Sequence, residues 1–138
     1  MEKACEMVRQ YGPLAGRLLL ALIFLISGYE KIGGFSKVAP FMAAQGVPFA
    51  ELALVVSIVV EIGGGLLLVL GWKARWAALA LLLWLIPVTL LFHNFWAVDA
   101  ARYQNQFNHF MKNLCIMGGM LYIMAYGAGP VSLDHRRT

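Results

Sequence analysis

The stretch Leu52-Ala-Leu-Val-Val-Ser-Ile-Val-Val-Glu61-Ile-Gly-Gly-Gly-Leu-Leu-Leu-Val-Leu-Gly71 decides the fold of this chain. A run of about 20 mostly apolar residues is long enough to cross a bilayer as a helix. Glu61 stands near its middle and is its only acidic residue. A carboxylate near the centre of the bilayer costs roughly 3 kcal/mol or more unless it is paired with a cation, protonated or in contact with water. Glu61 therefore indicates a functional site; the alternative interpretation is a protonated side chain that holds closely packed helices together.

The composition of the whole chain places it in the membrane class. Of its 138 residues, 61% are hydrophobic and 13% are charged, and the mean hydropathy is +0.73. Soluble domains carry about 25% charged residues, so a soluble globular class is excluded. The length allows one domain, residues 1–138. The small net charge of +4 indicates a membrane-topology signal and no nucleic-acid partner.

Three further apolar segments lie on either side of the first, which makes four expected spans. Their approximate limits are residues 13–31, 51–70, 75–94 and 107–126. The start of the last one is set by counting about 20 residues back from Tyr126. The expected fold class is all-α: an integral membrane, four-helix transmembrane bundle that has the lipid bilayer as its surroundings.

The lysine and arginine residues outside the spans predict an orientation. The expected spans sort them into six on one side, Lys3, Arg9, Lys73, Arg75, Arg136 and Arg137, and three on the other, Lys31, Lys37 and Arg102. Cytoplasmic loops carry the excess of positive residues. We therefore expect a multi-pass protein of a bacterial-type inner (plasma) membrane with both termini in the cytoplasm.

Glycines beside Glu61 predict the direction in which its side chain points. Gly64 and Gly65 lie three and four residues after Glu61 and share its helix face. Small residues let helix backbones approach closely in lipid. The carboxylate should therefore point into the bundle or into a partner subunit. The glycine-rich faces also predict a homo-oligomer or a complex with a partner protein within the membrane.

Arg17 is one candidate partner for Glu61. It falls about one turn into the first span. Its guanidinium could reach Glu61 on the neighbouring helix and keep both groups ionised. The alternative is that its long side chain extends to the nearer membrane surface.

A second group of polar residues is expected near the opposite membrane surface. It consists of Lys31, His93, His109, Lys112 and Asn113. Ionisable residues inside spans mark ligand or proton pathways. The sequence predicts a pocket lined by His93, Lys112 and Asn113, with Lys31 at its rim. The alternative is that Lys112 extends to the surface and His93 caps a helix.

Several redox and metal chemistries are disfavoured by the sequence. Cys5 and Cys115 are expected in opposite halves of the membrane, too far apart for a disulfide, and the chain has no C-x-x-C motif. His93 and His109 have no well-placed carboxylate beside them, so no metal site is predicted. We also find no haem-ligand pair and no nucleotide motif.

Short motifs spread along the chain are more specific together than alone. They are Arg17…Ser27-Gly28-x-x-Lys31, Phe41-Met-x-x-x-Gly46-Val-Pro48, Glu61-x-Gly63-Gly-Gly65…Gly71, Phe92-His93-x-Phe95, Met111-Lys112-Asn113-Leu114…Gly118-Gly119 and Gly127-x-Gly129-Pro130-x-Ser132-Leu-Asp134. Their order and spacing resemble the DoxX family of small inner-membrane proteins over residues 13–134. The resemblance implies a four-helix membrane fold, with the family's polar positions at Arg17, Lys31, Glu61, His93, Lys112 and Asn113.

The resemblance also implies a connection to redox systems. Family members are linked to thiosulfate:quinone oxidoreductase and quinol oxidase systems, and others to thiol and oxidative-stress defence. One expected function is the membrane subunit of a quinone-linked oxidoreductase, in which Glu61 and Arg17 relay protons. Its ligand residues would be Lys31, His93, His109, Lys112 and Asn113, and its ligand a quinone or another small redox substrate. The other is a non-enzymatic scaffold or assembly partner for soluble redox or stress-defence proteins.

Overall fold

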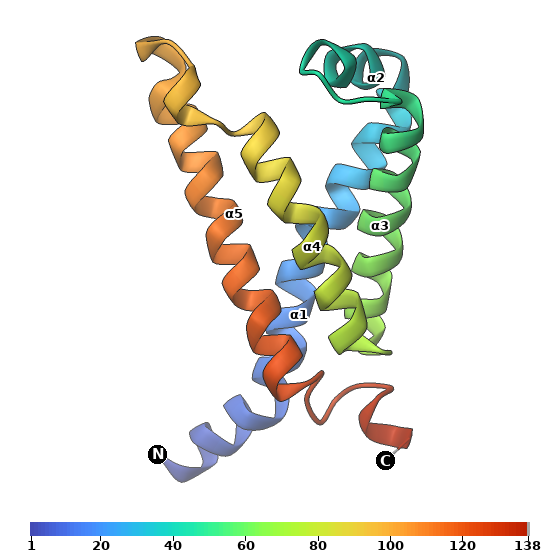
Figure 1. Ribbon diagram of the computed structural model, residues 1–138. Coiled ribbons are helices and arrows are strands. Elements are labelled where there is room, and N and C mark those ends of the chain that lie inside the picture. Colours follow the sequence, from blue (N-terminus) through green and yellow to red (C-terminus); the bar gives the residue numbers. More distant parts are fainter. Residues whose placement is uncertain (138) are drawn as a thin grey trace.

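The computed structural model describes residues 1–137 and confirms the all-α class. Its elements are α1 (Glu2–Gly33), α2 (Phe35–Ala44), α3 (Ala50–Leu70), α4 (Ala74–Phe92), η1 (Phe95–Ala97), α5 (Ala100–Tyr126) and η2 (His135–Arg137). Figure 1 shows α1, α3, α4 and α5 running up and down in a bundle, with both termini at one end. The short helix α2 lies across the other end. We call these the terminal end and the α2 end.

Three segments are long and apolar enough to cross a membrane among the described residues. They are α1, α3 and the segment Ala74–Ala97, which contains α4 and η1. Helix α5 has 27 residues, which is sufficient length, but its first half is polar. The structure therefore agrees with a helical membrane bundle, and the crossing by α5 stays a prediction.

Helices α1 and α5 begin well before the expected spans. α1 starts at Glu2 and α5 at Ala100, because a helix need not end at the membrane surface. Asp99 caps α5: its Oδ1 accepts a hydrogen bond from Arg102 N at 3.0 Å, and its Oδ2 accepts one from Arg102 Nε at 2.9 Å. These bonds hold the pKa of Asp99 below its usual value. Helix α2 was not expected from the sequence.

Glycines bring α3 into close contact with both of its neighbours. A Cβ at Gly64 would lie 2.8 Å from Cγ of Leu81 on α4, and one at Gly65 would lie 2.8 Å from Cδ2 of Leu25 on α1. Gly64, Gly65 and Glu61 are all buried, which confirms the predicted common face. These two glycines pack against helices of the same chain. Self-association of the protein stays a prediction.

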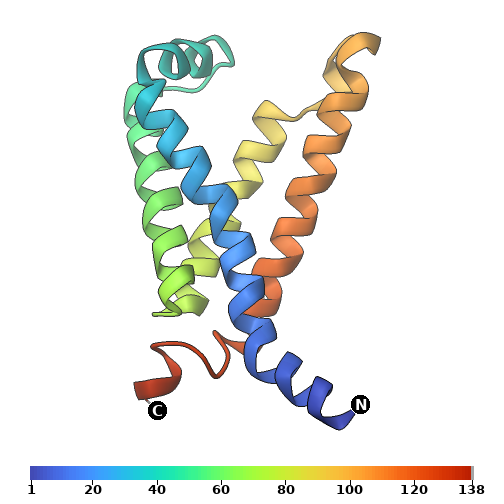
Figure 2. The same ribbon diagram turned by 180° about the vertical axis from the view of Figure 1, so that it is seen from behind.

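Two apolar clusters fill the bundle. The larger occupies the terminal half and joins α1, α3, α4 and α5 through residues such as Ala21, Leu81 and Met120. The smaller lies where α2 packs on α3 and includes Met42 and Leu54. Figures 1 and 2 show α1 and α5 diverging toward the α2 end. The side chains that carry the candidate site lie in the region between the two clusters.

The segment after α5 returns to the turn between α3 and α4. Asp134 N donates to Gly71 O at 2.9 Å. The Asp134 carboxylate accepts hydrogen bonds from the backbone of Lys73 at 2.7 Å and of Ala74 at 2.9 Å. A carboxylate at this position satisfies N–H groups that have no partner within the helix. Asp134 thus serves as an N-terminal cap for α4, although it is distant in sequence.

Asp134→Ala should therefore lower the free energy of unfolding by about 1 kcal/mol, the usual loss when a helix cap is removed. Asp134→Asn should lose less, because the amide oxygen can still accept from one backbone N–H. The measurement is unfolding in mixed detergent micelles, followed by circular dichroism. Equal midpoints for Asp134→Ala and the wild type would show that the cap contributes nothing.

Candidate functional site

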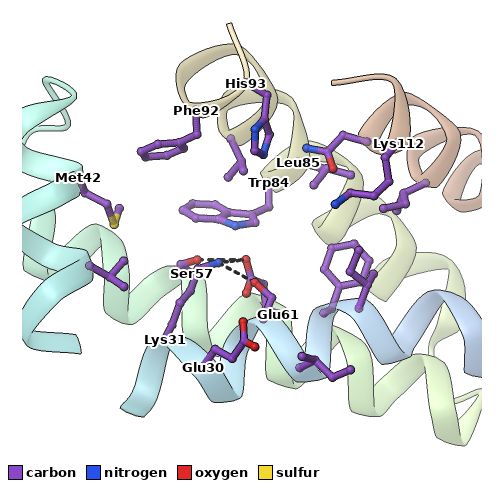
Figure 3. Close-up of a pocket in the computed structure, with 18 of the residues that line it drawn as sticks. Glu30, Lys31, Met42, Ser57, Glu61, Trp84, Leu85, Phe92, His93 and Lys112 are labelled. Atoms are coloured by element: carbon purple, nitrogen blue, oxygen red, sulfur yellow. Dashed lines mark hydrogen bonds and ion pairs between the residues drawn. The ribbon is translucent and has the colours of Figure 1, made fainter. Parts of the chain in front are cut away.

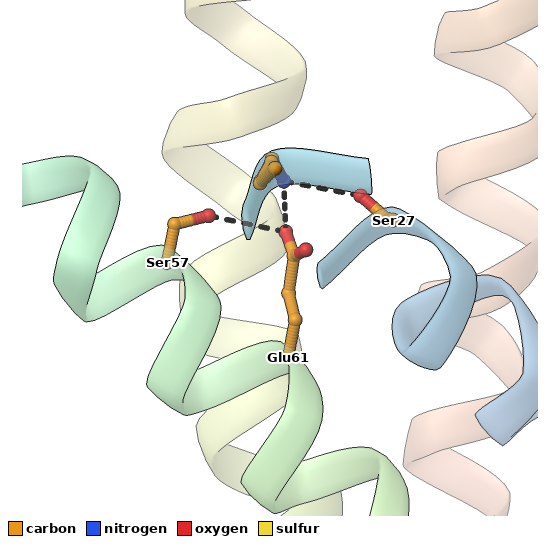
Figure 4. A network of polar contacts seen from close by, with 4 residues as sticks. Ser27, Ser57 and Glu61 are labelled. Carbon is orange, nitrogen blue, oxygen red and sulfur yellow. Dashed lines mark hydrogen bonds and ion pairs between the residues drawn. The ribbon is translucent and has the colours of Figure 1, made fainter. Parts of the chain in front are cut away.

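Glu61 is buried and paired with a cation from the neighbouring helix. Lys31 Nζ of α1 lies 2.5 Å from Glu61 Oε1, and their side chains are 22% and 5% exposed. Ser57 Oγ donates to the same oxygen at 3.2 Å, and Lys31 Nζ donates to Ser27 Oγ at 3.1 Å. Figure 4 shows this network between α1 and α3. The predicted burial of Glu61 is confirmed.

The antiparallel packing of α1 on α3 decides which cation reaches Glu61. Gly28 of α1 lies against Ile62, and Leu25 lies against Gly65. Lys31 comes one turn after Gly28 on the same face, so it is level with Glu61. The predicted pairing of Glu61 with Arg17 is therefore wrong, because Arg17 lies several turns away, toward the terminal end.

Arg17 has a different role in the structure. It is only 2% exposed, and its Nη1 donates to Leu68 O at 2.5 Å and to Val69 O at 3.2 Å. Its Nη2 donates to Val131 O at 2.6 Å. The guanidinium thus satisfies carbonyls in the last turn of α3 and in the returning C-terminal segment. The guanidinium extends toward the terminal end, so the alternative in which Arg17 reaches toward the nearer membrane surface stays a prediction.

A cavity of about 390 Å³ opens beside the ion pair in the half of the bundle nearer α2. Helices α1 to α5 all contribute to its lining. The apolar part of the wall includes Phe24, Phe41, Trp84 and Phe92. Figure 3 shows Trp84 extended into the cavity, with Ser57 and Glu61 on one side and Phe92 and His93 on the other.

Four of the predicted ligand residues line this one cavity. They are Lys31, His93, Lys112 and Asn113. His109 does not line it, and instead lies behind Lys112, with its Nδ1 3.0 Å from Lys112 Nζ. The rings of His93 and His109 stack with centroids 5.0 Å apart. The structure thus brings the polar residues of α4 and α5 together with the α1–α3 ion pair; ligand binding stays a prediction.

Hydrogen bonds on the α4–α5 side hold two of these residues in place. Asn113 Nδ2 donates to Thr89 Oγ1 at 3.0 Å, and Thr89 in turn donates to Leu85 O at 2.6 Å. His93 Nδ1 lies 2.9 Å from Gln106 Oε1. Asn113 is buried, so its role is partly structural. The N–H groups that remain for a ligand come mainly from Lys31, Lys112 and the second nitrogen of His93.

Two buried polar atoms on residues that line the cavity have no hydrogen-bond partner in the described part of the chain. They are Glu61 Oε2 and Trp84 Nε1. A buried polar group without a partner costs about 1–3 kcal/mol. One atom is a hydrogen-bond acceptor and the other a donor. A ligand group that both donates and accepts would match the pair.

Sequence reasoning missed three polar residues of the site. Ser27 and Ser57 precede Lys31 and Glu61 by four residues, so each serine shares a helix face with the charged residue it contacts. That spacing was a usable signal. Trp84 gave none, because a tryptophan within an apolar span is equally typical of lipid-facing surfaces.

The titratable side chains of the described residues do not form a metal centre. No group of three or more His, Cys, Asp or Glu side chains comes close enough to hold a metal ion there. The cavity instead offers aromatic surface, ammonium and imidazole donors, and one buried ion pair. This arrangement can bind a flat, mostly apolar molecule that carries oxygen atoms.

Comparison with known proteins places the chain among small membrane proteins. A model of the DoxX family matches residues 12–94. Inner membrane protein YphA of Escherichia coli is 31% identical over 123 residues, covering 89% of this chain and 88% of that protein. Inner membrane protein YqjF of Escherichia coli is 36% identical over 123 residues, covering 89% of each. A Surfeit locus protein 4 homolog of Schizosaccharomyces pombe is 28% identical over 131 residues, covering 94% of this chain and 38% of that protein.

No solved structure matches the chain significantly. The family model, however, covers more than half of the chain, including Lys31, Glu61 and His93. The two Escherichia coli proteins match it over nearly its full length. Together with the membrane-spanning helices, these matches show that this chain is a membrane protein of the DoxX family.

Proposed function

We propose that the chain binds a quinone, or an aromatic redox compound of similar size, in its cavity and acts as the membrane subunit of a redox system. The observation that carries this proposal is the combination of aromatic walls and N–H donors in one cavity. Trp84 and Phe92 offer ring faces, and Lys31, Lys112 and His93 offer donors for quinone oxygens. The volume of about 390 Å³ lies within the usual range of small-molecule sites, about 300–1,000 Å³.

The two unpartnered atoms of the lining support the same ligand class. The indole N–H of Trp84 can donate to a carbonyl oxygen, and Glu61 Oε2 can accept from a hydroxyl group. A quinone and its reduced form present carbonyl and hydroxyl oxygens respectively. A bound quinone would supply electron transfer coupled to proton transfer.

The ion pair of α1 and α3 is the proposed proton-handling group. Lys31 Nζ donates a hydrogen bond to Glu61 Oε1 at 2.5 Å. The hydroxyls of Ser27 and Ser57 extend this hydrogen-bond network on either side. Arg17 is left out of the proposed relay because its guanidinium bonds to carbonyls at the terminal end. His109 acts only through Lys112 in this proposal.

The proposed route of entry is from the lipid. Ile26 of α1 and Phe41 of α2 line the cavity and are each at least half exposed. Figure 2 shows α1 and α5 diverging toward the α2 end, the half of the bundle that holds the cavity. Because Ile26 and Phe41 are exposed, an apolar ring carried in the bilayer could enter past them without crossing water.

Purification of the protein with native lipid should test this function directly. We expect quinone in near-stoichiometric amount after organic extraction and chromatography. Lys112→Ala should weaken quinone binding about tenfold, since one charge-assisted hydrogen bond contributes about 1.5 kcal/mol. Lys37→Ala is the matched control, because Lys37 is an exposed lysine at the α2 end that does not line the cavity.

Absence of quinone from a lipid-rich preparation of folded protein would contradict the proposal. The scaffold function would then replace it, with the polar side chains serving only to hold the helices or a partner. Equal quinone content in Lys112→Ala and Lys37→Ala would place the ligand outside this cavity. Circular dichroism of each variant shows whether the bundle is intact.

A further inference from the structure

The start of α1 separates into an apolar and a polar face. At about 100° per residue, Ala4, Met7, Val8 and Tyr11 fall within one half of the helix surface. The opposite half carries Glu2, Lys3, Glu6, Arg9 and Gln10. Every residue from 2 to 11 is exposed, and Val8 is 68% exposed. The rest of the described chain therefore leaves this apolar face uncovered.

The apolar face continues without a break into the lipid-facing side of the span. Val8 and Tyr11 are followed at helical spacing by Leu18, Leu22 and Ile26, all of which are exposed. The opposite face of the same helix carries the buried residues Arg17, Ala21, Phe24 and Gly28. The surface that meets lipid in the span is thus the same surface that is apolar in residues 2–11.

Pro13 sets the direction in which the helix bends. Its ring lacks an N–H and clashes with the carbonyl four residues earlier, that of Arg9, so the helix opens on the proline side. Pro13 shares a helix face with the buried Arg17 and lies against the returning C-terminal segment, because a Cβ at Gly129 would lie 2.9 Å from Pro13 Cγ. The helix therefore bends toward its lipid-facing side. Figures 1 and 2 both show the N-terminal part of α1 pointing away from the other helices.

A helix that bends toward its lipid-facing side brings that side down onto the membrane. The apolar half of residues 2–11 would then lie on the concave side of the bend, against the bilayer, and the charged half would face water. The charged half carries two acidic and two basic side chains, Glu2, Glu6, Lys3 and Arg9, which cancel. Attraction to anionic lipid is therefore not the source of binding; burial of apolar surface is.

We propose that residues 2–11 form an interfacial helix that lies on the bilayer surface at the terminal end, with Val8 and its apolar neighbours immersed in lipid. This segment anchors α1 beside the point where Arg17 holds the last turn of α3. The proposal is independent of the ligand in the cavity. The lipid interface is the occupant of this face, because the face is continuous with the lipid-facing side of the span.

Site-directed spin labelling tests the proposal in the full chain. The background carries Cys5→Ser and Cys115→Ser, and single labels are introduced by Val8→Cys on the apolar face and Glu6→Cys on the charged face. In phosphatidylcholine vesicles, the Val8 label should be several-fold more accessible to oxygen than to a water-soluble nickel chelate. The Glu6 label should show the reverse. Addition of phosphatidylglycerol should leave both values unchanged.

Reference labels keep the result interpretable. Leu22→Cys reports the lipid-facing span, and Gln104→Cys reports an exposed position at the α2 end. Pro13→Ala should straighten the helix and make the Val8 label accessible to the nickel chelate, while Leu22 keeps its lipid signal. Labels at Val8 and Glu6 that are both open to the chelate would overturn the proposal. So would labels shielded from both reagents, since a protein partner would then cover the face.

Discussion

Replacing Arg17 with methionine is expected to lower the free energy of unfolding by about 3–5 kcal/mol, because several charge-assisted bonds to buried carbonyls are lost together. The guanidinium links the end of α3 to the returning segment through Leu68, Val69 and Val131. Methionine keeps most of the apolar side-chain volume but has no donor. The change should appear as an earlier unfolding midpoint in detergent and as faster proteolysis after Tyr126.

Two further variants make this prediction specific. Arg17→Lys should recover only part of the stability, since an ammonium lacks the planar fork that reaches carbonyls in two directions. Arg102→Met is the matched control, because Arg102 pairs with Asp99 at the protein surface, where the side chains are 68% and 56% exposed. It should leave the midpoint close to that of the wild type. If Arg17→Met behaved like Arg102→Met, the assigned role of Arg17 would be wrong.

Replacing Lys31 with methionine is expected to lower the free energy of unfolding by about 3 kcal/mol, because it leaves the Glu61 carboxylate buried without its cation. We expect the lower end of the stability loss that is usual when a buried ion pair is broken, since the Lys31 side chain is 22% exposed. Glu61→Gln should change stability little, because the amide still accepts from Lys31 and Ser57. Unfolding in mixed micelles measures both variants, with Lys37→Met as the exposed-lysine control.

The double variant Lys31→Met/Glu61→Gln decides between the two interpretations of Glu61. If the carboxylate is ionised, the double variant should recover most of the stability lost in Lys31→Met, because the unpaired charge is gone. If Glu61 is protonated and acts only to hold the helices together, Lys31→Met alone should have almost no effect. Equal stability of the wild type and Lys31→Met would thus reject the ion pair as a stabilising feature.

The membrane class and the helical architecture followed from the sequence alone. Runs of about 20 apolar residues must form helices in lipid, because each backbone N–H and C=O has to be satisfied within its own segment. The burial of Glu61 could also be predicted, since Gly64 and Gly65 share its face and packed helices meet at small residues. These are local properties, which depend only on helix period and residue size.

The pairing of charged residues was decided by the tertiary structure. Both Arg17 and Lys31 lie on the inner side of α1, and helix period alone does not distinguish them as partners of Glu61. The choice depends on how far α1 and α3 slide along each other, which the contact of Gly28 with Ile62 sets. Arg17 then falls beside the last turn of α3, where free carbonyls are available.

The cavity was likewise only half predictable. His93, Lys112 and Asn113 could be grouped by their depth in the membrane, because depth follows from counting residues at 1.5 Å each along a helix. Lys31 could be placed at the rim in the same way. That Glu61 also lines the cavity and His109 does not depends on how the helices pack. Sequence determines which face each helix turns inward, whereas register and crossing angle depend on the packing of all the helices together, and only the folded chain decides them.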